Sequence, residues 1–359
     1  MTATLHKSFE VFLQEKGYET GNLPGSRSYK STQLEKGKMM KMPPSVTLVH
    51  QPYRHIDHVE FMNVQDVQEF VKYWQFSLHQ VEQRCGWMYG YYLDDPNVAG
   101  GYRAVVEGIY EPSQVCVDDE VKVLSNDERT QVDVIANELG LELIGFIFTS
   151  LARGSDHLMN SYELVRGANM QMANSTKDHY TKYALSKFIT CIVHPDMQKE
   201  GSPQTDVFMV SDQLCGMMRD KLVVDEQADK KRLEIRPALP GEIQPQVLEA
   251  GRNATNNFDP DWFVVKINSG APVVPKSFFI HAHFPRENRP NTFIARSEIK
   301  KYLSKCNSNE PNWMKLADFH LIIYIAKFFD IETAKVICQA VRDRTTVDPD
   351  LFELIRAAE

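Results

Sequence analysis

The chain has 359 residues, of which 43% are hydrophobic and 25% are charged, and it carries a formal net charge of -8. This length allows about two or three domains with ample buried core, and the composition is typical of a globular protein. Nucleic-acid binding is not expected, because neutralising phosphates requires a dense Lys/Arg surface that this acidic chain does not offer.

The first predicted element is an amphipathic helix over residues 5–16. Phe9, Phe12 and Leu13 fall on one face of that helix at helical spacing. The Lys-rich stretch that follows, residues 21–44, has the Gly and Pro content of a linker.

Regular structure resumes with residues 45–61, whose alternation predicts strands. A helix capped by Asn63 follows. Two strands are then predicted at residues 86–93 and 102–112, separated by a turn rich in Asp, Pro and Gly. The buried stripe of the helix is predicted to consist of Val67, Phe70, Val71 and Trp74.

The middle of the chain continues with a helix over residues 126–139 and a strand over residues 141–149. A third helix is predicted to start near Asn160. Two more apolar strands are predicted at residues 186–195 and 205–211. Helices flanking a mixed sheet predict an α+β fold with α/β character for this block.

The last part of the chain is predicted to be mostly α-helical. A charged block with scattered Pro and Gly, residues 225–257, is predicted to contain a loop. From Glu298 onward the periodicity predicts a small all-α bundle. Its helices are expected at residues 298–306, 314–329, 331–344 and 349–358.

The six cysteines are scattered and form no C-x-x-C pair, so the sequence predicts neither a zinc finger nor a dense disulfide framework. A reducing compartment is therefore expected. No signal peptide pattern opens the sequence, and the longest apolar run is well short of the roughly 18 residues that suggest a membrane span. We expect the protein in the cytoplasm and nucleus, without membrane insertion.

Four segments in chain order, GWMYGYY, RAVVEGIYEPSQ, GLELIGFIFTS and SKFITCIV, resemble the MPN fold of the JAMM metalloisopeptidases. A longer ordered set resembles the nuclear protein localization four family. Members of that family recruit substrates to the AAA ATPase segregase called valosin-containing protein. This set consists of YRHIDHVEF, GWMYGYY, AVVEGIYEPSQ, GFIFTSL, KFITCIV, FPRENR and DFHLIIYI, and SFEVFLQEKG near the N-terminus also looks like the family.

The resemblance predicts a division of the chain into domains, with one departure from the family pattern. The family carries a ubiquitin-like domain that docks on the ATPase and paired-Cys zinc elements, whereas residues 21–44 stand where those cysteines are expected. Docking through these parts therefore has no support in the sequence. The predicted parts are an N-terminal helix and linker (1–45), an MPN-like domain (46–224), an extension and connecting segment (225–297) and a helical C-terminal domain (298–359).

An active JAMM site needs a Glu, an H-x-H-P motif and the Asp of S-x-x-D, because two neutral imidazoles and a carboxylate hold zinc while the Glu accepts a proton from bound water. The resemblance places the Glu position on Tyr91, the two His positions on Phe148 and Ser150, and the Pro on Leu151. The S-x-x-D position falls on residues 160–163. Phenylalanine cannot ligate zinc and one carboxylate cannot hold it alone. The sequence therefore predicts a pseudoenzyme without metal, cofactor or catalytic residues at this site.

The sequence offers two catalytic alternatives to the pseudoenzyme. His281 and His283 mimic H-x-H, and a metalloisopeptidase with a rearranged site around them is the enzymatic alternative. Phe284 stands where the motif requires Pro, which favours packed or surface histidines. Cys191 lies in an apolar strand, where a buried, unreactive thiol is the usual case.

The resemblance implies that the groove of the MPN-like domain holds an extended segment of ubiquitin. Capture of an extended chain at a strand edge is a general recognition mode. Core packing is an equally favoured role for two of the candidates, Trp87 and Tyr89. The candidate groove residues are Trp87, Tyr89, Tyr91, Phe148, Ser150, Asn160 and Glu163.

The resemblance further implies that the C-terminal region grips folded ubiquitin. A short apolar surface near the end of the chain would suit the hydrophobic face of ubiquitin. Core packing is the favoured alternative for each member. The candidates are Leu351, Phe352, Leu354 and Ile355.

The function implied is that of a non-catalytic ubiquitin-binding adaptor in ubiquitin-dependent protein degradation. Its expected partners are polyubiquitin, the ubiquitin fusion degradation one protein and the AAA ATPase valosin-containing protein, with recruitment to the endoplasmic reticulum surface through partners. The alternatives are a zinc metalloisopeptidase acting as a deubiquitinase and a purely structural MPN scaffold in a larger complex.

Overall fold

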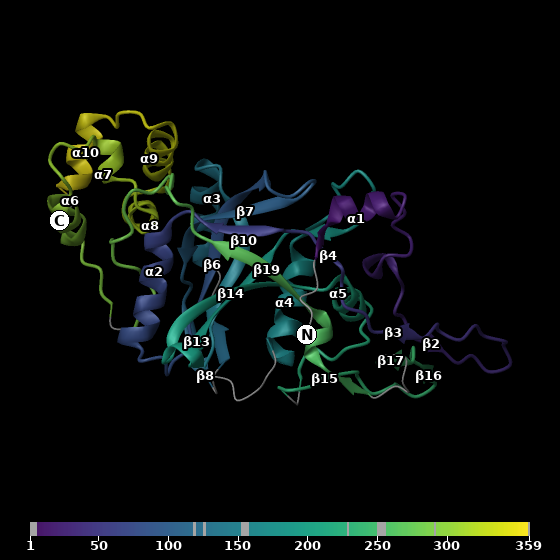
Figure 1. Ribbon diagram of the computed structural model, residues 1–359. Helices are drawn as coiled ribbons and strands as arrows, with labels where there is room; N and C mark the ends of the chain where they lie inside the picture. Colours follow the sequence, from purple (N-terminus) through teal and green to yellow (C-terminus); the bar gives the residue numbers. More distant parts are fainter. Residues whose placement is uncertain are drawn as a thin grey trace.

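A closed barrel of seven strands forms the centre of the protein, in the order β10-β13-β14-β19-β5-β7-β6 (Figure 1). The computed structural model describes residues 6–117, 120–124, 127–151, 158–227, 230–249, 256–290 and 292–357. The barrel strands are β5 (His58–Phe61), β6 (Cys85–Asp94), β7 (Tyr102–Tyr110), β10 (Glu142–Thr149), β13 (Ile189–Asp196), β14 (Ser202–Val210) and β19 (Val264–Gly270).

The barrel mixes parallel and antiparallel neighbours. β6 runs antiparallel to both β7 and β10, and β14 runs antiparallel to both β13 and β19. β10 is parallel to β13, and β5 is parallel to both β7 and β19. Successive side chains on β6 join different apolar clusters, Trp87 in one and Met88 in the other, as the period of two in a strand requires. The predicted α+β class with a mixed sheet is confirmed.

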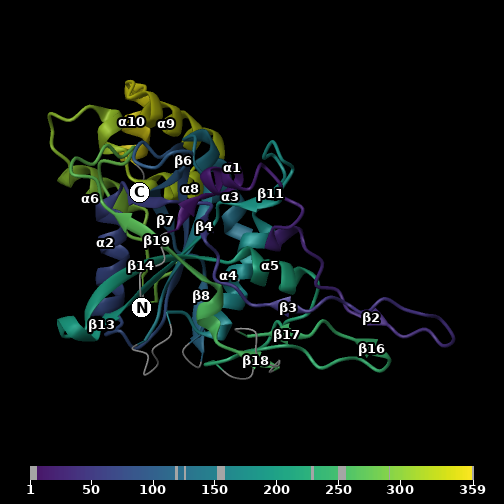
Figure 2. The same cartoon turned by 45° about the vertical axis from the view of Figure 1, so that its right-hand side comes forward.

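Helices cover the barrel on several sides. α2 (Val64–Lys72) begins at the predicted cap, because the Asn63 side chain accepts a hydrogen bond from the backbone N–H of Asp66. α4 and α5 lie together, whereas α3 lies beside the C-terminal helices (Figures 1 and 2). The remaining helices of this part are α1 (Phe9–Glu15), α3 (Asp127–Glu138), α4 (Ser161–Ala173) and α5 (Asp212–Arg219).

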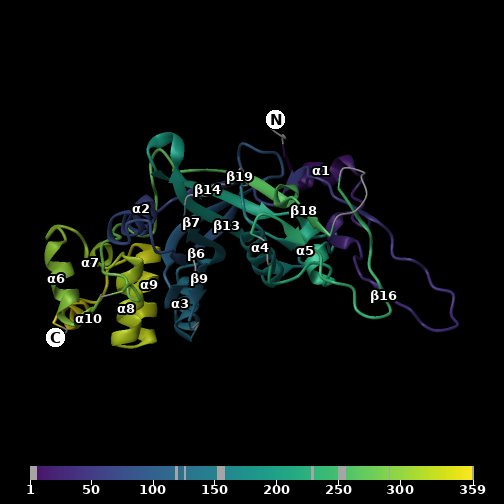
Figure 3. The ribbon, with the colours of Figure 1, turned by 90° about the horizontal axis from the view of Figure 1, so that it is seen from below.

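The C-terminal helices gather at one end of the molecule (Figure 3). The prediction of one helix over residues 314–329 is wrong, because Asp318 starts a new helix by accepting hydrogen bonds from the N–H groups of His320 and Leu321. The helix that follows is buried nearly all round, as its composition predicts. The elements are α6 (Ser297–Lys305), α7 (Asn312–Lys315), α8 (Phe319–Phe328), α9 (Ile331–Asp343) and α10 (Pro349–Arg356).

The helical unit is attached to the barrel at a close contact between α8 and β7. A Cβ atom added to Gly108 would lie 2.7 Å from the ring of Phe319. The Phe319 ring also lies 5.9 Å from the ring of Tyr89 on β6. Glycine at position 108 therefore allows the first turn of α8 to pack directly on the sheet.

The N-terminal region is tied to the segment after α5. The predicted helix is present as α1, but it starts at Phe9, because the Ser8 hydroxyl caps it. Much of the predicted linker forms an arm with residues 236–246 that projects from the body (Figures 2 and 3). The pairs are β1 (Lys7–Ser8) with β4 (Tyr53–Arg54), β2 (Thr32–Gln33) with β16 (Glu242–Ile243), and β3 (Val46–Thr47) with β17 (Val247–Leu248).

Several elements were absent from the prediction, including β19, α5 and the hairpin of β8 (Gln114–Val117) and β9 (Glu120–Val123). Among the described residues, none of the helices has the length and apolar character needed to cross a membrane. Short elements complete the structure: the pairs β11 (Ser175–Thr176) with β12 (Leu185–Ser186) and β15 (Leu233–Glu234) with β18 (Asn257–Phe258), the 3₁₀ turns Pro24–Ser26, Met197–Lys199 and Pro260–Phe263, and a π-helical turn Tyr73–Ser77.

Candidate binding site at the end of strand β10

A cavity of about 170 Å³ lies where β10 ends and α4 begins. The apolar run of β10 carries the chain to Thr149, and the helix start at Asn160 brings it back to the same place. Four of the predicted groove residues line this cavity: Phe148, Ser150, Asn160 and Glu163. The other residues that line it are Glu120, Val121, Thr149, Leu151, Tyr162, Arg166 and Lys230.

The carboxylate at this site holds the start of α4. The Asn160 side chain accepts a hydrogen bond from the Glu163 N–H at 2.8 Å, and Glu163 accepts one from the Asn160 N–H at 2.9 Å. This reciprocal arrangement is a capping box, which satisfies two backbone donors at a helix start. The Ser150 hydroxyl also donates to Glu163, at 3.4 Å. These hydrogen bonds hold the Glu163 carboxylate at the start of α4.

Basic side chains border the cavity. The Arg166 guanidinium lies 4.4 Å from the centre of the Phe146 ring and donates to the Val121 carbonyl at 3.2 Å. Lys230 pairs with Glu120 at 3.5 Å. The first contact is a cation–π interaction, which holds the guanidinium over an apolar face.

An apolar rim lies on the elements next to the cavity. β8 and β9 pair only with each other in the described part of the chain, so each leaves one edge outside the pair. Val115 and Val117 of β8 are exposed, and so is Leu158, just before α4. The cavity is smaller than the roughly 300 Å³ at which small-molecule pockets begin. It suits a single side chain of a polypeptide lying along this rim.

The expected position of Tyr91 in this groove is wrong. β6 is antiparallel to β10, with Cys85 opposite Phe148 and Gly90 opposite Glu142. Tyr91 therefore lies beside the beginning of β10, about 20 Å from its end, at roughly 3.3 Å per residue.

Trp87 and Tyr89 lie outside the cavity as well. Both are buried, and the Tyr89 hydroxyl donates to Asp133 at 2.6 Å. The Trp87 ring packs 4.9 Å from the ring of Phe146 and lies under the Arg129 guanidinium. The structure therefore places these two side chains in the core, which was the alternative reading of the alternating pattern.

The start of β6, next to Gln83, is the part of that strand that lies beside the cavity. The Thr149 hydroxyl donates to the Gln83 side chain at 2.9 Å and accepts from the Arg84 N–H at 2.9 Å. Gln83, Arg166 and Lys230 were missed by sequence reasoning. The signal that could have found Gln83 is strand direction, because antiparallel neighbours place the start of one strand beside the end of the other.

The cysteines near the barrel have environments that oppose nucleophilic chemistry. Burial raises the pKa of the Cys85 thiol to about 12, despite the nearby Arg166. Burial also raises the pKa of Cys191. A thiol that keeps its proton at neutral pH is a poor nucleophile, in line with the predicted unreactive role of Cys191.

The apolar surface predicted near the C-terminus is not formed. Phe352 and Ile355 are buried, and Leu351 packs against the same core. Leu354 is 59% exposed. Because α10 turns its apolar stripe inward, Leu354 is the one member of the four that remains at the surface.

The histidines of the enzymatic alternative do not converge. His283 is exposed, whereas His281 turns toward Glu310, with Nε2 and Oε2 3.6 Å apart. Their backbone N–H groups also have different partners: the His283 N–H donates to Asp318, and the His281 N–H donates to the Ala317 carbonyl. The two imidazoles therefore do not form the paired ligands of an H-x-H motif.

The closed mixed barrel, its appended helical unit and the cavity at the end of β10 define the class of this protein as an α+β barrel with a strand-end site. The sequence model described as the NPL4 family matches residues 84–358. The chain therefore belongs to the NPL4 family.

Curated relatives agree with this assignment. The chain is 28% identical to Nuclear protein localization protein 4 of Debaryomyces hansenii, covering 85% of this chain and 57% of the relative. It is 29% identical to the Saccharomyces cerevisiae protein of that name (79% and 54% covered) and 28% identical to the Drosophila melanogaster homolog (85% and 50% covered). The chain thus spans about half the length of the curated relatives it matches.

A second model, described as the putative zinc binding region of the NPL4 family, matches residues 29–77. These residues include no cysteine. Among their histidines, His50 stacks on Trp262 and His55 is bonded to Asp212 at 2.9 Å. The region is thus present in the chain, but its residues do not fit a zinc site.

Proposed function

We propose that this chain is a non-catalytic ubiquitin-binding adaptor that recruits polyubiquitinated substrates to the AAA ATPase valosin-containing protein. In this proposal the cavity at the end of β10 and its apolar rim hold an extended segment of ubiquitin. The ubiquitin fusion degradation one protein is the proposed co-partner. The proposed location is the cytoplasm and nucleus, with recruitment to the endoplasmic reticulum surface through partners, as in the degradation of proteins from that compartment.

One observation carries the proposal. The cavity lies where the resemblance to metalloisopeptidases expects zinc, yet Phe148 stands at a ligand position and the carboxylate of Glu163 caps a helix. Phenylalanine offers no donor atom, and a carboxylate that already accepts hydrogen bonds from a backbone N–H and a hydroxyl is a poor sole ligand. What remains is a cavity next to elements that carry exposed apolar side chains, which supports binding of an extended chain without hydrolysis.

The rim supplies the physical means of binding. Val117 is 40% exposed on β8, which pairs only with β9 in the described part of the chain, and Leu158, just before α4, is also exposed. An extended segment can use main-chain hydrogen bonds along such an edge and place alternate side chains in pockets. Burying rim valine and leucine side chains adds apolar contact.

The test is co-elution of the chain with ubiquitin tetramers on a sizing column, with the tetramer checked for cleavage. The wild-type chain should carry intact tetramer. Val117→Lys and Leu158→Lys should each weaken binding about tenfold, which corresponds to about 1.4 kcal/mol, because a charge is introduced into an apolar contact. Val336→Lys is the matched control, since Val336 is 47% exposed on the distant α9.

The outcomes separate the three hypotheses. Cleaved tetramer, with cleavage stopped by a chelator, would support the metalloisopeptidase. Intact tetramer that elutes apart from the wild-type chain would favour the structural scaffold. Equal loss in Val117→Lys and Val336→Lys would remove the rim from the binding site.

A further inference from the structure

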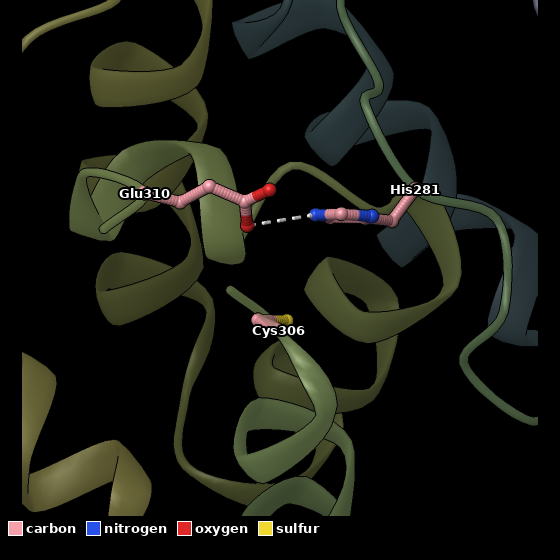
Figure 4. A group of neighbouring side chains, drawn as sticks. All are labelled: His281, Cys306 and Glu310. Atoms are coloured by element: carbon pink, nitrogen blue, oxygen red, sulfur yellow. Dashed lines mark ion pairs between the residues drawn. The ribbon is translucent and has the colours of Figure 1, made fainter. Parts of the chain in front are cut away.

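Three potential metal ligands meet where the connecting segment touches the helical unit. His281 lies in the segment between β19 and α6, and an isolated parallel bridge joins it to Asp318. Cys306 follows the last residue of α6, and Glu310 lies in the loop before α7. Figure 4 shows the three side chains turned toward a common space.

The distances among these side chains are close to those of a metal site. One ligand atom from each residue can be chosen so that all lie within 4.8 Å of one another, and His281 Nε2 is 3.6 Å from Glu310 Oε2. Around a tetrahedral zinc ion with bonds of about 2.0–2.3 Å, neighbouring ligand atoms are about 3.3–3.7 Å apart.

The donor atoms that face each other are buried and lack hydrogen bonds. His281 Nε2 and Glu310 Oε2 have no hydrogen-bond partner in the described part of the chain, although water cannot reach either atom. Leaving a buried polar atom unsatisfied costs about 1–3 kcal/mol. A cation between them would satisfy both atoms.

We propose that His281, Cys306 and Glu310 form a binding site for a divalent transition-metal ion, with Zn²⁺ as the best match. Imidazole nitrogen, thiolate sulfur and carboxylate oxygen are the three donor types that zinc uses in proteins. The site is separate from the cavity at the end of β10. It is also separate from residues 29–77, which match the family's putative zinc binding region.

Tyr302 supports this group of ligands from α6. Its ring lies edge-on to His281, with centroids 6.3 Å apart, and its hydroxyl donates to Asp318 at 3.2 Å. Its carbonyl accepts a hydrogen bond from the Cys306 thiol at 3.7 Å. Metal binding releases the thiol proton, so it replaces this hydrogen bond and weakens as the pH falls.

The ion would tie the connecting segment to the helical unit. His281 belongs to the connecting segment, whereas Cys306 and Glu310 belong to the end of α6 and the loop beyond it. Binding to the folded chain alone raises stability by mass action. The role expected from this geometry is therefore to hold the helical unit on the barrel.

The experiment measures zinc content after dialysis and follows titration of the metal-free chain with Co²⁺ by absorption spectroscopy. The wild-type chain should bind one equivalent and show a thiolate-to-cobalt charge-transfer band. Cys306→Ala should abolish the band. His281→Ala and Glu310→Gln should weaken binding at least about tenfold, since even indirect partners of metal ligands contribute 10–100-fold.

Two matched controls use the same residue types elsewhere. His283→Ala removes an exposed imidazole two residues away, and Cys116→Ala removes a partly buried thiol on β8. Both should bind Co²⁺ like the wild-type chain. Glu310→Gln is nearly isosteric and should keep the fold even if Cys306→Ala loses structure. Circular dichroism checks the fold of both variants.

The proposal is overturned by absence of the charge-transfer band in the wild-type chain or by its persistence in Cys306→Ala. Undiminished zinc in Glu310→Gln and His281→Ala would place the ion elsewhere in the chain. Neither result bears on the rim of the β10 cavity, because ubiquitin binding is measured separately with the Val117 and Leu158 variants.

Discussion

Two buried carboxylates at different places show how differently this chain uses the same residue type. Glu163 at the end of β10 accepts hydrogen bonds from a backbone N–H and a hydroxyl. Glu111, just after β7, contacts the guanidinium groups of Arg84, Arg286 and Arg289. The hydrogen bonds described for Glu163 come from residues nearby in the sequence, whereas Glu111 joins residues far apart in it.

The electrostatic consequence is clearest at Glu111. Burial alone would raise its pKa, but Arg289, Arg286 and Arg84 hold the pKa well below its ordinary value. Arg286 extends the group to Asp66 of α2, which also bonds His320 at 3.0 Å. This charge cluster joins the barrel, the connecting segment and the helical unit.

The charge cluster around Glu111 stabilises the fold, whereas the region of the β10 cavity is the one that we propose for recognition. The segment FPRENR, residues 284–289, looks in the sequence like part of a connection. In the structure its two arginines neutralise buried carboxylates. The side chains that we propose for ubiquitin binding, Val115, Val117 and Leu158, are instead exposed and apolar, on elements next to the β10 cavity.

Breaking the charge cluster should have the largest effect on stability. Arg286→Met removes a buried cation and leaves Glu111 and Asp66 with less compensation. Removing one partner of a buried ion pair costs about 3–5 kcal/mol. Urea denaturation should show this loss in the free energy of unfolding.

A surface ion pair at the same junction provides the control. Lys327 is 48% exposed at its side chain and pairs with Glu128 and Glu287, each at 3.0 Å. Exposed pairs contribute about 0–1 kcal/mol, so Lys327→Met should be nearly silent. Similar losses in Arg286→Met and Lys327→Met would contradict a special role for the buried cluster.

A third carboxylate, Glu107, sharpens the comparison through its pH dependence. It lies four residues before Glu111, but no guanidinium among the described residues pairs with it, and it accepts hydrogen bonds from the Ser277 hydroxyl and the Phe278 N–H. Burial raises its pKa to about 7, although these two hydrogen bonds oppose the shift.

The sign of the effect follows from proton binding in the two states. Between pH 4.5, the ordinary value, and about 7, the unfolded chain loses the Glu107 proton while the folded chain keeps it. Stability from this group is therefore complete below the lower value and is lost as the pH rises, by about 3 kcal/mol in total. Glu107→Gln should gain stability relative to the wild-type chain as the pH rises from 4.5 to about 7. Parallel stability curves for the two proteins would contradict the raised pKa.

Local sequence signals predicted the strands and helices that have clear periodicity. β6, β7, β10 and β13 follow from apolar runs bounded by turns, and the capped starts of α2 and α4 are confirmed. α5 was missed although its signal is present: Ser211 caps it, and Leu214 and Met217 share a face.

Other features had no local signal. Closure of the barrel depends on β19 pairing with β5, about 200 residues earlier in the chain, and such long-range pairing leaves no trace in a short window. Tyr91 was misplaced because the sequence does not give the register of β6 against β10. The Glu310 ligand of the proposed metal site was missed for the same reason, since the bridge between His281 and Asp318 brings its loop close.

Removing the capping box at the cavity should have the smallest effect on stability. The experiment tests whether the box stabilises only the start of α4. Asn160→Ala removes the side chain that accepts from the Glu163 N–H, and loss of such a cap costs about 1 kcal/mol. Hydrogen exchange should accelerate in the first turn of α4, while the charge cluster at Arg286 stays protected. Asn174→Ala, at the other end of α4, removes one exposed hydrogen bond to Met170 and should cost less than about 0.5 kcal/mol. If both variants behave alike, Asn160 does not hold the helix start. If Asn160→Ala also loosens the whole barrel, the cavity and the charge cluster are not the independent regions described above.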